Sequence, residues 1–146
     1  MTMGQRVELN SDQIANFKTI FGDRFVTTES VLDEHGRDES AFPPVMPSAV
    51  IYVKSTDEVS QVMKICSDQK IPVVPFGAGT SLEGHVLPIQ GGISLDLSLM
   101  NKIIEIRADD LIVRVQPGVH RMALNEKLAS AGLFFSVDPG ADATLG

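Results

Sequence analysis

A glycine-rich segment near the middle of the chain has residue types and spacing suited to binding phosphate. Ile71 to Val74 form a short apolar run, and Pro75-Phe76-Gly77-Ala78-Gly79-Thr80-Ser81 with Gly84 follow it. Glycines have no Cβ, so the backbone can turn tightly and several N–H groups can converge on one anion. The hydroxyls of Thr80 and Ser81 can add donors. The pattern predicts a phosphate-binding loop at the carboxyl end of a strand, where ligands of open α/β sheets bind.

The glycine spacing separates this loop from two common nucleotide-binding loops. A P-loop needs a lysine directly after its last glycine, but Gly84 is followed by His85 and Val86. A Rossmann turn needs a glycine where Leu82 stands, and then a helix. Residues 84–92 are too rich in glycine, proline and β-branched residues to form that helix. A nucleoside triphosphatase is therefore excluded on chemistry, and a Rossmann turn is disfavoured.

The residues before the loop predict a strand, helix and strand that present it. Ala49 to Val53 is short and β-branched, Ser55 or Thr56 can cap a helix that runs to about Gln69, and Ile71 to Val74 is the second strand. A right-handed βαβ unit with parallel strands is the simplest arrangement.

The segment before this unit predicts one helix and an irregular stretch. Ser11 can cap a helix that carries apolar residues at helical spacing and ends at Gly22. Residues 27–40 are mostly polar, and the prolines that follow disfavour regular structure.

The residues after the loop predict a second group of elements. The expected strands are 93–97, 103–107, 111–115 and 133–137, with a hairpin turn at 108–110 and a helix over 122–131 that stops at Gly132. A second glycine-containing loop covers residues 138–146.

Composition limits the classes of partner. A chain of 146 residues with 43% apolar and 21% charged residues is typical of one soluble globular domain. The net charge of −7 argues against nucleic acid or an anionic membrane as a general partner. We expect a cytoplasmic protein without a membrane span, because neither a signal-like segment nor a sufficiently long apolar run is present. The single cysteine, Cys66, lies on an apolar helix face and is expected to be a buried thiol.

Two groups of polar residues could form further sites, but simpler roles are favoured. His85 is expected to pack or hydrogen-bond near the loop, and a metal site with Glu83 or Asp96 is disfavoured because structural sites show several closely spaced ligands. The run His35-Gly36-Arg37-Asp38-Glu39 is interpreted as a solvated capping or docking segment.

Several ordered motifs together resemble the FAD-binding domain of FAD-linked oxidases of the vanillyl-alcohol oxidase type, also called the PCMH type. Within that superfamily the chain is most similar to cytochrome-linked D-lactate dehydrogenases and to the D subunit of glycolate oxidase. The motifs are the run from His35 to Ser40, the loop from Pro75 to Gly84, Gly91-Gly92-Ile93, Gln116-Pro117-Gly118-Val119, Leu124-Asn125, and Asp138 to Gly146.

The resemblance implies an α+β fold, in which an N-terminal βαβ subdomain is followed by the start of a second, mixed α/β subdomain. Residues 1–48 would form an N-terminal helix and an extended docking segment, and residues 49–146 an incomplete FAD-binding domain. Some members of the superfamily attach the flavin covalently through a histidine at the place of Thr80, so non-covalent FAD is expected here. The implied FAD-binding residues are Pro75, Phe76, Gly77, Ala78, Gly79, Thr80, Ser81, Gly84, Pro139, Gly140, Ala143, Thr144 and Gly146.

The resemblance also implies a function, the oxidation of a D-2-hydroxy acid of the lactate or glycolate class by hydride transfer to FAD. Relatives of this kind are several hundred residues long, and their catalytic base and metal-binding histidines lie beyond the matching part. We therefore assign no catalytic or metal-binding residue, and expect the 146 residues alone to be inactive. The alternative is a shortened, non-catalytic module that binds a phosphate ligand or a partner. Self-association through exposed sheet surface is also expected.

Overall fold

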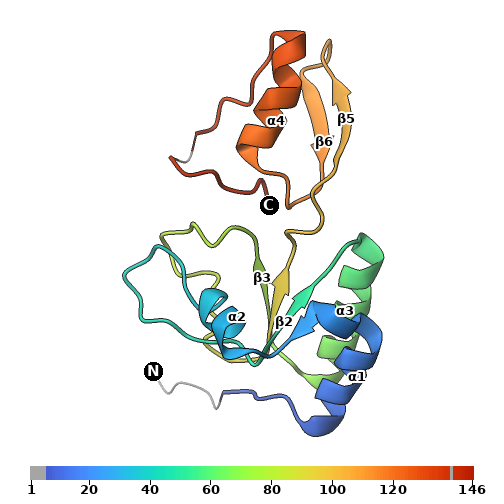
Figure 1. Cartoon of the computed structure of the whole chain (residues 1–146), viewed down its shortest axis with the longest axis vertical. Coiled ribbons are helices and arrows are strands. Elements are labelled where there is room, and N and C mark those ends of the chain that lie inside the picture. Colours follow the sequence, from blue (N-terminus) through green and yellow to red (C-terminus); the bar gives the residue numbers. More distant parts are fainter. Residues whose placement is uncertain (1–5, 139) are drawn as a thin grey trace.

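A mostly parallel sheet with the strand order β1-β2-β4-β3 forms the centre of the larger part of the molecule (Figure 1). The computed structural model describes residues 6–138 and 140–146. β2 (Ala49–Tyr52) and β3 (Val73–Phe76) run parallel to β4 (Ile93–Asp96), which lies between them. β1 (Phe25–Val26) pairs antiparallel with β2 at one edge. The carboxyl ends of the three parallel strands therefore lie side by side.

Three helices accompany this sheet, and capping side chains define the starts of two of them. α1 (Ser11–Phe21) is capped by Asn10 in a capping box with Gln13, so the predicted cap, Ser11, is wrong by one residue. A 3₁₀ turn, Gly22–Arg24, follows α1. α3 (Thr56–Gln69) is capped by Ser55, which was one of the two predicted caps. α2 (Glu29–Glu34) is a short helix within the segment that was predicted to be irregular.

Alternation along the strands gives the sheet two different faces. Ala49, Ile51 and Val53 point to the face covered by α1 and α3, together with Ile93 and Leu95. Figure 1 shows α2 on the other side of the strands. The core of the first face also contains Phe17, Phe21, Val62 and Cys66. Cys66 is buried as predicted, and burial raises the pKa of its thiol to about 11.

A smaller unit follows the sheet and consists of a hairpin and one helix (Figure 1). β5 (Ile103–Arg107) and β6 (Ile112–Val115) are antiparallel, and the turn between them lies where it was predicted. α4 (Arg121–Leu128) continues into a 3₁₀ turn, Ala129–Ala131, which ends at Gly132. Leu124 and Leu128 pack with Val119 into a small buried cluster, as the helical spacing indicated.

Two further predictions about the strands are wrong in detail. The second strand begins at Val73 rather than Ile71 and includes Pro75, which an edge strand accommodates because its outer side needs no ladder hydrogen bond. The two strands of the expected βαβ unit are parallel, as predicted, with β4 inserted between them. Residues 133–137 form no strand, and the N–H of Phe135 donates to the Asn125 side chain instead.

In the described residues, no helix combines the length and apolar character needed to cross a bilayer.

Candidate functional site

The glycine loop begins directly after β3 and has the backbone shape that its glycines allow. Gly79 and Gly84 have φ values of +67° and +72°, in the left-handed region that side chains with a Cβ rarely adopt. A Cβ on Gly79 would lie 2.9 Å from Cζ of Phe76, so the loop rests closely on the ring of the preceding strand residue. Pro75 and Phe76, two of the predicted site residues, belong to the strand itself.

The middle of this loop presents backbone N–H groups that donate to no other described residue. Among the hydrogen bonds between described residues, none has the N–H of Ala78, Gly79 or Thr80 as its donor. Successive free N–H groups in a tight turn form a concave site for an anion. The structure therefore fits the predicted phosphate-binding role of these three residues.

The loop separates two clefts. One has a volume of about 680 Å³ and lies between the sheet, the segment after α2 and the start of α4. The other has a volume of about 430 Å³ and lies between residues 77–86 and residues 143–146. Gly77, Ala78, Gly79 and Thr80 line both clefts, so one long ligand could contact the loop and extend into both.

The second predicted loop lies against the first one. A Cβ on Gly77 would collide with the Thr144 side chain and lie 2.9 Å from the Gly146 carbonyl oxygen. Ala143, Thr144 and Gly146 therefore lie beside the glycine loop. Gly140 is exposed and does not line either cleft, and Pro139 lies outside the described residues.

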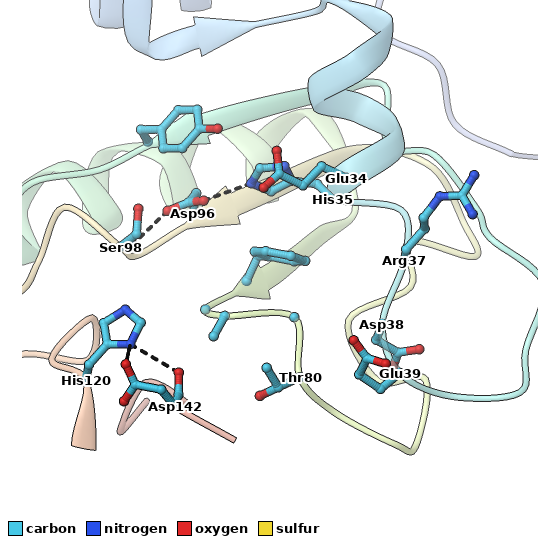
Figure 2. A pocket seen from close by; sticks show the side chains of 15 residues that line it. Glu34, His35, Arg37, Asp38, Glu39, Thr80, Asp96, Ser98, His120 and Asp142 are labelled. Atoms are coloured by element: carbon cyan, nitrogen blue, oxygen red, sulfur yellow. Dashed lines mark hydrogen bonds and ion pairs between the residues drawn. The ribbon is translucent and has the colours of Figure 1, made fainter. Parts of the chain in front are cut away.

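Hydrogen bonds to the β6–α4 region hold this second loop in place. The N–H of Arg121 donates to Ala143, and the N–H of Leu145 donates to Val119. His120 Nδ1 lies 3.2 Å from Asp142 Oδ2, a pair that Figure 2 shows at the mouth of the larger cleft. Sequence reasoning missed this pair, because nothing in the motif spacing connects two residues so far apart.

The segment after α2 contacts the glycine loop from the other side. Asp38 Oδ2 accepts a hydrogen bond of 2.9 Å from the N–H of Gly84, and the N–H of Glu39 donates to the Ser81 carbonyl oxygen over 2.9 Å. Burial alone would raise the pKa of Asp38, but hydrogen bonds from Ser40 and Gly84 outweigh it and lower the pKa. Asp38 and Glu39 thus contact the glycine loop directly, and the docking role of the whole segment stays a prediction.

His35 differs from its neighbours, because it is buried rather than solvated. Its side chain is 2% exposed, and its Nε2 lies 2.8 Å from Asp96 Oδ2, as Figure 2 shows. Arg37 instead points to solvent and forms an ion pair with Asp33. The prediction of a solvated segment is therefore wrong at His35, whose partner lies 61 residues away in the sequence.

The remaining titratable groups near the loop do not form a metal site with one another. His85 Nδ1 lies 2.9 Å from Ser81 Oγ, which confirms the predicted local hydrogen bond. Asp96, which was considered as its metal partner, is engaged by His35. Within residues 6–138 and 140–146, no cluster of three or more His, Cys, Asp or Glu side chains could bind a metal ion.

Carboxylates outnumber cations around the larger cleft. Its lining includes Glu34, Asp38, Glu39, Asp96 and Asp142, against Arg37 and two histidines. A phosphate group would be repelled by most of these side chains, and the loop N–H groups are its best partners.

Comparison with known proteins identifies the domain. A family model described as an FAD binding domain matches residues 47–146. The chain belongs to this family of FAD-binding domains. The chain is 43% identical over 133 residues to the probable mitochondrial D-lactate dehydrogenase of Danio rerio, and 37% identical over 145 residues to the mitochondrial D-lactate dehydrogenase [cytochrome] of Arabidopsis thaliana. It is 43% identical over 96 residues to glycolate oxidase subunit GlcD of Bacillus subtilis, which covers 66% of the chain and 20% of that protein.

These matches cover most of this chain but only a small part of each relative. The first two cover 90% and 98% of this chain but 27% and 26% of the relatives, so the chain spans about a quarter of their length. The predicted resemblance to FAD-linked oxidases, D-lactate dehydrogenases and the D subunit of glycolate oxidase is confirmed.

Solved structures support the same fold. The chain superposes on 4-ethylphenol oxidase from Gulosibacter chungangensis with a TM-score of 0.77 at 26% identity, over 92% of this chain and 28% of that one. For p-cresol methylhydroxylase the TM-score is 0.73 at 27% identity, over 82% of this chain and 24% of that one. The predicted fold class, a mixed domain of the PCMH type, is confirmed.

Proposed function

We propose that the chain is the FAD-binding part of a flavin-dependent oxidoreductase that oxidises a D-2-hydroxy acid of the lactate or glycolate class. The cofactor follows from the family, and the substrate class is supported by relatives that are named D-lactate dehydrogenases and a glycolate oxidase subunit. The observation that carries the proposal is the row of free N–H groups at Ala78, Gly79 and Thr80, beside the loop that ends at Gly146.

The residues of the two loops have distinct parts in this proposal. The N–H groups of residues 78–80 donate to the pyrophosphate. The absence of a Cβ at Gly77 lets the two loops approach each other, and its absence at Gly79 lets the loop rest on the Phe76 ring. Thr144 and Gly146 form the opposite wall. When FAD is bound, its flavin ring supplies the chemistry by accepting a hydride. Binding is non-covalent in our proposal, because Thr80 stands where a covalently bonded histidine would be expected.

We assign no catalytic residue to the chain. Both ring nitrogens of His35 are engaged, by Val31 and Asp96, so this buried residue presents none to a substrate in the clefts. The comparisons give no support to the alternative of a non-redox module, since the curated relatives reported above are oxidoreductases.

A matched pair of glycine substitutions tests the cofactor site. Gly79 and Gly132 have nearly equal φ values of +67° and +68°, but a Cβ meets Phe76 only at Gly79 and nothing within 4 Å at Gly132. Both valine variants carry the same backbone strain, but only Gly79→Val also collides with the Phe76 ring and so displaces the loop N–H groups. We expect Gly79→Val to weaken FAD binding by at least about tenfold, equivalent to about 1.4 kcal/mol, and Gly132→Val to leave it unchanged.

The measurement is titration of the purified chain with FAD, followed by flavin absorbance and by the shift in melting temperature. Equal affinities of Gly79→Val and the unaltered chain would contradict our placement of the pyrophosphate. The substrate class is tested separately, in a protein that carries these residues together with the remainder of a flavin domain. D-lactate or glycolate should reduce its flavin, L-lactate should not, and the reverse preference would refute the proposed class.

A further inference from the structure

A column of packed groups leads from the glycine loop down to the buried histidine. Gly79 lies on the ring of Phe76, whose Cζ would be 2.9 Å from a Cβ at Gly79. The ring of Phe76 lies on the ring of His35, with centroids 4.3 Å apart. His35 in turn bonds to Asp96. Phe76, His35 and Asp96 are 6%, 2% and 4% exposed, so the column is closed to solvent below the loop.

Strand register explains why these groups meet. Asp96 of β4 pairs with Tyr52 of β2 on one side and with Phe76 of β3 on the other, so three side chains lie in a row at the carboxyl end of the sheet. They point to the same face, because paired residues of neighbouring parallel strands share a face. His35 follows α2 and lies over this row, with its ring edge-on to Tyr52 at 5.7 Å between centroids.

The hydrogen bonds of His35 fix the orientation of its ring. Nδ1 lies 2.9 Å from the Val31 carbonyl oxygen, which can only accept, so Nδ1 carries a proton and donates it. Nε2 and Asp96 Oδ2 share a second proton, and the other carboxylate oxygen accepts from the N–H of Ser98 over 2.7 Å. Whichever of the two holds the shared proton, the pair has no net charge, which suits its burial. With both nitrogens engaged, the ring cannot rotate without losing a buried hydrogen bond.

We propose that His35 is a positioning residue for the cofactor loop. Its ring, oriented by Asp96 and Val31, supports the ring of Phe76 and thereby sets the position of Gly79 and of the neighbouring N–H groups. His35 lies outside residues 47–146, which the family model matches, so the loop inside the matched domain depends on a residue before it. The identity of the bound ligand as FAD rests on the proposed function, whereas the support of the loop does not.

Replacing His35 by glutamine tests this role. His35→Gln keeps an N–H donor for Asp96 but removes the ring under Phe76. A packed aromatic pair is worth roughly a tenfold change in an equilibrium constant, so we expect the FAD dissociation constant to rise about tenfold. Without FAD, the NMR signal of the Gly79 α-proton that points at the Phe76 ring should lose its ring-current shift.

Two variants separate positioning from general destabilisation. Asp96→Asn keeps an oxygen for Ser98 and can donate to Nε2 of His35, so the ring should stay in place. The FAD dissociation constant should then change by less than about threefold, a smaller effect than the loss of one hydrogen bond, and the Gly79 signal should keep its ring-current shift. Val62→Ala opens a cavity on the other face of the sheet, at a side chain with no exposure. It should lower the melting temperature without changing either readout.

The outcomes decide the proposal in each case. It is overturned if His35→Gln binds FAD as the unaltered chain does and keeps the Gly79 shift, or if Val62→Ala changes both readouts equally at temperatures where both variants are folded. If His35→Gln does not fold, Phe76→Leu replaces it, because leucine removes the ring between His35 and Gly79 and should give the same losses. If the unaltered chain binds no FAD, the cofactor assignment for these residues fails, and the Gly79 shift alone decides the role of His35.

Discussion

The four-stranded sheet and the β5–β6 hairpin differ in how completely each covers its apolar residues. Every residue of β4 is buried, whereas every residue of β5 except Ile103 is exposed. The sheet is covered on one face by α1 and α3, and on the other by α2 and the segment that follows it. The hairpin shares a small cluster with α4, which contains three buried residues, and residues 133, 135 and 145 pack against it. A strand pattern thus indicates which residues can pair, but not which part of a chain supplies the cover.

The uncovered apolar residues of the smaller unit are large. Leu111 is 76% exposed and Phe134 is 74% exposed. Both line the same small cavity, and exposed apolar surface of this kind is typical of a region that contacts other protein. Self-association through it stays a prediction. The other exposed apolar residues of this unit are Ile104, Ile106, Ile112, Met122 and Val137.

The largest expected difference between the two units is the loss of unfolding free energy when a buried side chain in each is replaced by alanine. Ile51 in β2 and Leu124 in α4 both have no exposure. We expect Ile51→Ala to lower the free energy of unfolding by about 4 kcal/mol and Leu124→Ala by about 2 kcal/mol, because a cavity in a small cluster collapses more easily.

Urea unfolding followed by the fluorescence of Tyr52, the only tyrosine, reports on the sheet, and circular dichroism reports on the whole chain. Equal losses of unfolding free energy in the two variants would show that both cores are equally rigid, and would contradict the difference between the sheet and the hairpin unit.

An intermediate effect is expected from one ion pair in each unit. Arg24 binds Glu58 through two hydrogen bonds of 2.6 and 2.8 Å, and Glu58 also accepts from the N–H of Lys54. In the hairpin, Glu105 lies 3.7 Å from both Arg107 and Arg114, with exposed side chains. We expect Glu58→Gln to cost about 1 kcal/mol at neutral pH, and Glu105→Gln less than about 0.5 kcal/mol.

The pH dependence of stability gives a further test of the Glu58 pair. Hydrogen bonding to Arg24, opposed by burial and aided by the Lys54 N–H, lowers the pKa of Glu58. A carboxyl whose pKa is lower in the folded state stabilises the fold above its unfolded-state pKa and loses that contribution as the pH falls through its folded-state pKa. Stability should therefore fall less steeply on acidification in Glu58→Gln than in the unaltered chain. Parallel curves would show that the pair contributes nothing.

The smallest effect concerns two left-handed residues that are not glycine. Lys70 ends α3 with a φ of +56°, and Leu111 follows the hairpin turn with the same value. Glycine removes the strain at such a position but adds freedom to the unfolded chain, so the net gain is about 0.5 kcal/mol. Lys70→Gly should raise the midpoint of sheet unfolding. Leu111→Gly should leave that midpoint unchanged and slow only amide exchange in β5 and β6, and a change in the sheet midpoint would show that the two units unfold together.

Most elements with a strong local signal were predictable from the sequence. The helix capped at Ser55, the hairpin, and α4 with its stop at Gly132 depend on neighbours within a few residues. Residues 133–137 show the limit of such signals, because their apolar content fits a strand but no partner strand lies beside them. α2 has no buried residue, so it has no apolar stripe that could indicate a helix.

The candidate site was predictable only in its loops. The glycine spacing and the order of the motifs pointed to Gly77, Gly79, Thr144 and Gly146, which the structure brings together. His35 lies in a polar run and looks solvated by composition. Its burial depends on Asp96, and on a sheet order in which β4 lies between β2 and β3. Neither is encoded near His35 in the sequence.

The separation of 61 residues between His35 and Asp96 also has a kinetic consequence. Contacts between distant residues form late, because the entropy of closing the intervening chain is lost before the contact stabilises anything. Helix α3 and the β5–β6 hairpin involve only near neighbours and can form early. We therefore expect the glycine loop to acquire its final shape only in the last stage of folding, after β4 has entered the sheet and placed Asp96 under the ring of His35.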